Sequence, residues 1–146
     1  KSKFIGELRD LPFAVTLRTS IVGHELYSKH ALMDWFLSQR GPVVPGFRRS
    51  IFSGMTAIEL ARIMRDVVLS NPSLHGLYNV SSAPISKFEL LKLVAAQYGK
   101  TIEVRSDDSL VIDRSLDSSK FQHLTGYRPP SWESMVRTMH DVKKQY

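Results

Sequence analysis

The 146-residue sequence contains no cysteine, and this absence excludes several kinds of site. Without a thiol the chain has no disulfide, no thiolate zinc site and no cysteine nucleophile. No apolar run approaches the roughly 20 residues that a membrane-spanning helix needs. We therefore expect no membrane partner, and the lack of cysteine suits a reducing cytoplasm, which is the location we expect.

Metal and hydrolytic chemistry also lack their usual signals. No Gly-x-Ser-x-Gly turn and no phosphate-binding loop is present, so hydrolase and nucleoside-triphosphatase functions have no support. The five histidines show no metal-ligand spacing; they are His24, His30, His75, His123 and His140. We expect no metal site.

Basic residues outnumber acidic ones, 20 against 14, which gives a formal net charge of +6. Such a balance raises the question of nucleic-acid binding. The basic residues are dispersed, however, and neither a dense basic run nor an RNA-binding aromatic motif occurs. The charge therefore favours small anionic ligands, or solubility alone, over a nucleic-acid partner.

Apolar periodicity and helix caps predict short strands that alternate with helices. Strands are expected at 13–22, 77–81 and 101–105, with a short one at best at 43–44. Helices are expected at 30–39, from 56, at 86–98, at 118–124 and from 131, and residues 1–9 have the pattern of a helix middle. This order predicts α/β packing. The strand that begins at Phe13 has no predicted neighbour of similar length, so we expect its partners to lie outside this chain.

Two helices begin with capping boxes, in which a hydroxyl and a carboxylate three residues later satisfy free backbone N–H groups. These are Thr56 with Glu59 and Ser86 with Glu89. The apolar stripes of the helices are expected to be core. In the helix from 56 the stripe is Ile58, Ala61, Met64, Val67 and Val68, and in the last helix it is Trp132, Met135, Val136, Met139 and Val142.

Short motifs occur in an order that is typical of one enzyme family. They are Lys3 followed by Gly6-Glu7, Arg18-Thr19-Ser20, Ala57-Ile58-Glu59-Leu60-Ala61, Leu77-Tyr78-Asn79-Val80-Ser81, Leu116-Asp117-Ser118-Ser119-Lys120, and Gly126 to Trp132. On these residues the chain resembles the extended short-chain dehydrogenase/reductases. The resemblance is closest to the dTDP-4-dehydrorhamnose reductases and the NAD-dependent sugar-nucleotide epimerases.

The resemblance implies the C-terminal portion of a Rossmann-type fold, with helices alternating with short strands. Residues 1–22 would end the cofactor-binding domain, and residues 23–146 would form the substrate-binding part. The implied reaction is hydride transfer between NAD or NADP and a sugar carbon of a nucleotide-sugar. The glycine-rich cofactor loop and the catalytic tyrosine are absent, so the chain by itself is expected to be inactive.

Lys3 would be the lysine of the family's Tyr-x-x-x-Lys helix, with Lys1 as the alternative. The tyrosine would lie two residues before Lys1. An ammonium group one helical turn after that tyrosine would lower the phenol pKa from its usual value of about 10. The same ammonium would hydrogen-bond the nicotinamide ribose, so the resemblance implies both a catalytic and a cofactor-binding role for Lys3.

The resemblance also places Thr19 and Ser20 beside the nicotinamide carboxamide, at the C-terminal end of a strand where α/β sheets bind ligands. Ile21 would stand where relatives contact the sugar. The alternative is that all three residues simply finish a buried strand.

Arg48, Arg49 and Arg114 are the candidates for binding the diphosphate of the substrate, because the planar guanidinium suits phosphate groups. A solvated surface position is the alternative for each of them. Ile21 cannot hydrogen-bond a sugar, and this favours a second hypothesis, a non-catalytic sugar-nucleotide-binding or assembly module with the same fold. A homodimer is possible, since relatives often dimerise through the helix that residues 1–9 would end.

Overall fold

The computed structural model describes residues 2–9, 11–25, 27–28 and 30–143, except the side chains of Ser2 and Lys3. The helices are α1 (Ser2–Ile5), α2 (Leu32–Ser38), α3 (Ala57–Ile63), α4 (Lys87–Gln97), α5 (Ser119–Thr125) and α6 (Trp132–Lys143). A π-helical segment, η1 (Met64–Val68), continues α3. The strands are β1 (Val15–Arg18), β2 (Ile21–Val22), β3 (Val43–Phe47), β4 (Ser50–Phe52), β5 (Met55–Thr56), β6 (Gly76–Asn79), β7 (Ile85–Ser86), β8 (Glu103–Asp107) and β9 (Ile112–Arg114). The predicted alternation of helices and short strands is confirmed.

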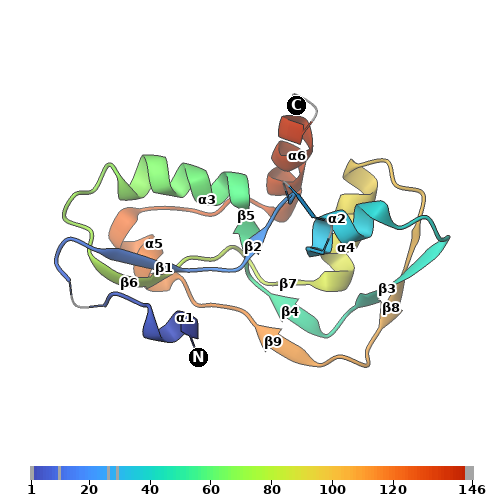
Figure 1. Ribbon diagram of the computed structural model, residues 1–146, viewed down its shortest axis with the longest axis horizontal. Helices are drawn as coiled ribbons and strands as arrows, with labels where there is room; N and C mark the ends of the chain where they lie inside the picture. Colours follow the sequence, from blue (N-terminus) through green and yellow to red (C-terminus); the bar gives the residue numbers. More distant parts are fainter. Residues whose placement is uncertain (1, 10, 26, 29, 144–146) are drawn as a thin grey trace.

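Most strand pairs are parallel, as expected for α/β packing. β1 pairs with β6, β2 with β5 and β3 with β8, while β7, β4 and β9 form a three-stranded sheet in that order. Only the β4–β7 pair is antiparallel among the described strands. The β1–β6 pair lies at one end of the elongated molecule and the β3–β8 pair at the other (Figure 1).

The prediction that the first strand has no partner in this chain was wrong. β1 pairs with β6 over its whole length, from Val15 opposite Gly76 to Arg18 opposite Asn79. Parallel neighbours need a long crossover between them. Here the crossover contains β2 to η1, so the pairing could not be recognised from adjacent segments.

The predicted continuous strand 13–22 is split in two. Phe13 lies outside the strand and is 82% exposed. The chain stops pairing with β6 before Thr19 and Ser20. It then forms β2, where Ile21 lies opposite Met55 of β5. Gly54 makes this change of partner possible, because a Cβ at Gly54 would lie 2.3 Å from the carbonyl oxygen of Ser20. The split brings the end of β1 to the surface instead of burying it.

The prediction at 43–44 was too short. β3 extends through Pro45 to Phe47 and pairs in parallel with β8 over five residues. Proline has no N–H to donate, and it is tolerated in strands that are paired along one edge. β4 and β9 were not predicted, since each is only three residues long.

The hydroxyl half of both predicted capping boxes is confirmed. The Thr56 Oγ1 accepts a hydrogen bond from the Glu59 N–H at 3.3 Å, and the Ser86 Oγ accepts one from the Glu89 N–H at 3.1 Å. At the other ends, Gly99 and Gly126 take left-handed conformations with φ of 61° and 71°, Gly99 two residues after α4 and Gly126 directly after α5. Glycine adopts this conformation at little cost, which is why the helices stop there.

The core lies between α4, α6 and the strands beneath them. Four members of the predicted α6 stripe are buried, as expected, and they pack with Leu90, Leu91 and Val94 of α4. The stripe predicted for α3 was partly wrong. Ile63 is buried, whereas Met64 is 53% exposed. The face of α3 that carries Met64 turns to an open cavity instead of the core.

Candidate ligand-binding site

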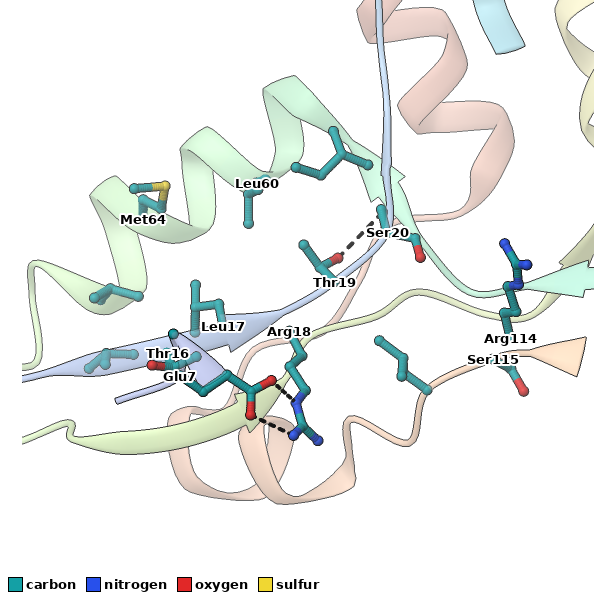
Figure 2. A pocket seen from close by; sticks show the side chains of 15 residues that line it. Glu7, Thr16, Leu17, Arg18, Thr19, Ser20, Leu60, Met64, Arg114 and Ser115 are labelled. Atoms are coloured by element: carbon teal, nitrogen blue, oxygen red, sulfur yellow. Dashed lines mark hydrogen bonds and ion pairs between the residues drawn. The ribbon is translucent and has the colours of Figure 1, made fainter. Parts of the chain in front are cut away.

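A cavity of about 820 Å³ lies between β1 and the helix formed by α3 and η1. Leu60, Met64 and Val68 form its helical wall, and β1 forms the opposite wall. Figure 2 shows these walls, with the segment after β1 crossing between them. The volume falls within the range of about 300–1,000 Å³ that is usual for small-molecule sites.

Thr19 and Ser20 line this cavity at the C-terminal end of β1. This is where parallel strands of α/β proteins present ligand-binding groups. The Ser20 carbonyl already accepts a hydrogen bond from the Met55 N–H at 2.9 Å. Among the described residues, the Thr19 hydroxyl makes one long hydrogen bond of 3.4 Å, to the same carbonyl. The Thr19 hydroxyl is therefore available to a ligand, whereas the Ser20 backbone oxygen mainly holds the strand in place.

Arg114 reaches the same cavity from β9, where it lies opposite Phe52 of β4. Ile21 also lines the cavity, and its side chain is 59% exposed. The structure thus brings together Thr19, Ser20, Ile21 and Arg114, which come from the end of β1, from β2 and from β9 (Figure 2).

The structure does not bring Arg48 and Arg49 to this cavity. Both lie in the turn between β3 and β4, outside the set of residues that line it. Arg48 forms two hydrogen bonds with the Asp108 carboxylate, at 3.0 and 2.7 Å, and this contact raises the pKa of the guanidinium. The ion pair is about half exposed, which matches the surface alternative for Arg48.

The backbone of Lys3 lies in α1, but its side chain is outside the part of the molecule that the structure describes. The chain after this helix does reach the site, because Gly6 and Glu7 line the cavity. The role expected for the Lys3 ammonium therefore stays a prediction.

A charged cluster on the cavity wall was not predicted. The Glu7 carboxylate accepts hydrogen bonds from the Arg18 Nε at 2.6 Å and Nη2 at 2.7 Å, and another from the Arg9 Nη2 at 2.7 Å. The hydrogen bonds from Arg18, and then from Arg9, lower the pKa of Glu7 from 4.5 to about 2. The cluster ties the chain after α1 to β1. Glu7 and Arg18 both belong to the motifs noted in the sequence, but nothing in those motifs shows that they pair.

Within the described ranges, no group of three or more His, Asp or Glu side chains could hold a metal ion. No described helix has both the length and the apolar character needed to cross a membrane.

No protein-family model and no curated protein matches this sequence. Solved structures do match. The dTDP-4-dehydrorhamnose reductase of Bacillus anthracis in complex with NADP superposes with a TM-score of 0.73 and 19% identity, over 88% of this chain and 48% of that one. A dTDP-4-dehydrorhamnose reductase of Clostridium acetobutylicum gives a TM-score of 0.74 and 12% identity, over 89% and 49%.

A UDP-N-acetylglucosamine 4-epimerase of Methanobrevibacter ruminantium in complex with UDP-N-acetylmuramic acid gives a TM-score of 0.66 and 19% identity, over 90% of this chain and 46% of that one. The chain thus spans about half the length of the solved structures it matches. The predicted fold class is confirmed: this chain has the fold of part of a Rossmann-type extended short-chain dehydrogenase/reductase.

Proposed function

We propose that this chain is the substrate-binding part of an NAD(P)-dependent oxidoreductase that acts on a nucleotide-sugar, of the dTDP-4-dehydrorhamnose reductase type. One observation carries the proposal. Thr19 and Ser20 of the Arg18-Thr19-Ser20 motif line one cavity with the candidate diphosphate ligand Arg114, in a fold shared with such enzymes. Residues 1–22 are the end of the cofactor-binding domain in this proposal, and residues 23–146 are the substrate-binding part.

The residues present fit the nicotinamide end of a dinucleotide cofactor. In the described part of the chain the Thr19 hydroxyl has one long hydrogen bond, and it borders a cavity of adequate volume. NAD or NADP would supply the hydride. The residues of this chain would bind and orient: Thr19 holds the nicotinamide end, and Arg114 holds the diphosphate of the sugar substrate. The Lys3 ammonium would lower the pKa of a tyrosine placed one helical turn before it, and so hold a proton ready for the carbonyl oxygen.

Calorimetric titration with dTDP-glucose and UDP-glucose, together with an NAD(P)H oxidation assay on a 4-dehydro sugar nucleotide, tests this function. We expect the 146-residue chain to bind a nucleotide-sugar and to leave NAD(P)H unoxidised. Absence of binding to every nucleotide-sugar tried would contradict the substrate class. Oxidation that scales with the amount of chain would contradict the expected inactivity.

A specific observation favours a second function, a non-catalytic sugar-nucleotide-binding or assembly module. Ile21 lines the cavity with a side chain that is 59% exposed and has no hydrogen-bonding group. A catalytic site that recognises sugar hydroxyls usually places a polar group there. Nucleotide-sugar binding by the full-length parent protein without turnover would favour this second function over the first.

We also propose self-association through the segment from α1 to β1. Phe4, Ile5 and Phe13 are exposed to 61%, 81% and 82%, and large exposed apolar side chains on one stretch of chain favour an interaction surface. Light scattering after size-exclusion chromatography measures the oligomeric state. A monomer at concentrations near 100 μM, roughly the range of weak dimers, would speak against this association.

A further inference from the structure

A second, smaller cavity of about 230 Å³ adjoins the first. Ser20, Ile21 and Arg114 line both cavities, so the two share a boundary. The smaller cavity is otherwise lined largely by apolar side chains, among them Phe52 and Leu110. Its other charged residue is Lys87, which neither the sequence motifs nor the proposed function uses.

The three-stranded sheet places Lys87 and Arg114 on either side of β4. In this sheet Phe52 lies between Ile85 of β7 and Arg114 of β9. Lys87 follows β7 directly, as the first residue of α4. At the start of this helix Lys87 lines the smaller cavity, as Arg114 does from β9. Both cations then border the same small space.

The positive charge that borders the smaller cavity is not balanced by negative charge. No carboxylate of a described residue lines the smaller cavity. Neither Lys87 nor Arg114 forms an ion pair or a side-chain hydrogen bond with another residue in the part of the chain that the structure describes. The nearest acidic residues in sequence are engaged elsewhere: Asp113 accepts from the Ser115 N–H at 2.8 Å, and Glu89 pairs with Lys92 at 3.7 Å. Two unopposed cations beside apolar walls favour an anion between them.

We infer that Lys87 binds the diphosphate of the nucleotide-sugar together with Arg114, at the boundary between the two cavities. The identity of the ligand rests on the proposed function, whereas the anion site rests on the two cations alone. The smaller cavity has room for about seven water molecules at roughly 30 Å³ each, which is too little for a whole nucleotide-sugar. The ligand therefore spans both cavities, with its sugar toward Thr19 and its diphosphate between Lys87 and Arg114.

The test is a calorimetric titration of the chain with dTDP and, separately, with inorganic pyrophosphate. The variants are Lys87→Met and Arg114→Met, which keep the aliphatic stem and remove the charge. Lys92→Met is the matched control, because Lys92 lies on the same helix and lines neither cavity. Thermal unfolding of each variant verifies that it is folded. We expect the Kd for dTDP to rise about tenfold in each cavity variant and to change less than twofold in the control.

Unchanged dTDP affinity in folded Lys87→Met, with the parent chain binding normally, would overturn the role of Lys87 and leave the proposed function intact. Pyrophosphate binding that depends on Lys87, without any binding of dTDP or of nucleotide-sugars, would confirm the anion site and overturn the proposed substrate class. Absence of binding to both probes would overturn the anion site itself.

Discussion

Replacing Tyr127 by phenylalanine removes a single hydroxyl group, and we expect this loss to destabilise the fold strongly. The Tyr127 hydroxyl donates to the Glu59 Oε1 at 2.9 Å, and the Glu59 side chain is only 7% exposed. Burial, and then the hydrogen bond to Glu59, raises the pKa of Tyr127, so the phenol keeps its proton and goes on donating. The other partner of Glu59 in the described structure, Arg62, is more distant at 3.4 Å and half exposed.

The magnitude follows from these contacts. A hydrogen bond to a charged group contributes about 1.5–3 kcal/mol, and a buried carboxylate that loses its partner is costly to keep out of water. Phenylalanine keeps the ring contact with Phe121, whose centroid lies 6.0 Å from that of Tyr127. The loss of stability therefore comes from the missing hydroxyl alone. At about 3 °C per kcal/mol for a chain of this size, the Tm should fall by roughly 5–9 °C.

Urea unfolding followed by tryptophan fluorescence measures the free energy of unfolding. Tyr27→Phe is the matched control, since Tyr27 is 98% exposed and its hydroxyl is in solvent. In a Glu59→Gln background the cost of Tyr127→Phe should drop by about 1 kcal/mol, because the acceptor is then neutral. A Tyr127→Phe variant as stable as Tyr27→Phe would refute the reasoning, and would mean that Arg62 or water compensates the carboxylate.

Three further predictions concern the site wall and a helix start. Since the pKa of Glu7 is lowered from 4.5 to about 2, its pairing with Arg18 stabilises the fold above pH 4.5 and is lost as the pH falls toward 2. The stability difference between the parent chain and Glu7→Gln, measured by urea unfolding, should therefore shrink over that interval. Gly54→Ala would place a methyl group 2.3 Å from the Ser20 carbonyl oxygen, so we expect about 1–3 kcal/mol of destabilisation and weaker dTDP binding by calorimetry. Ser86→Ala removes the N-cap of α4 and should cost about 1 kcal/mol in the same unfolding assay.

Two substitutions serve as controls for these predictions. Glu103→Gln changes an exposed carboxylate that does not line the cavity and should leave the pH profile unchanged. Gly41→Ala should be close to neutral, because the nearest atom to its Cβ would be a carbonyl oxygen at 4.0 Å. A constant gap between the parent chain and Glu7→Gln from pH 6 to pH 2.5 would contradict the Glu7 prediction. Unaltered dTDP affinity in Gly54→Ala would mean that the position of Ser20 does not matter for binding.

Part of the candidate site was accessible from the sequence. Thr19 and Ser20 were singled out by a motif and Arg114 by its guanidinium, and the structure places all three on one cavity. Arg48 and Arg49 carried the same chemical argument, yet they lie in the turn after β3, and Arg48 pairs with Asp108. The presence of an arginine in the sequence does not show which residues its guanidinium contacts in the fold. The fold distinguishes these arginines, because strand pairing brings Arg114 to the end of β1 and does not bring Arg48 there.

Local signals determined the elements of this protein. Thr56 and Ser86 cap their helices through contacts three residues away, Gly126 ends α5, and the 3.6-residue period of α6 decides which side chains are buried. Each of these effects acts within one or two turns of chain, so the sequence is sufficient to recognise it.

Which residues come together at the candidate site was decided only by the tertiary structure. The pairing of β1 with β6, the change of partner at Ser20 and the approach of Lys87 to Arg114 join segments that are distant in the chain. Such contacts depend on crossovers between parallel strands, whose partners are chosen by the packing of the whole domain. The sequence by itself therefore determined which residues are candidates for binding a ligand, and the packing determined which of these candidates meet at one cavity.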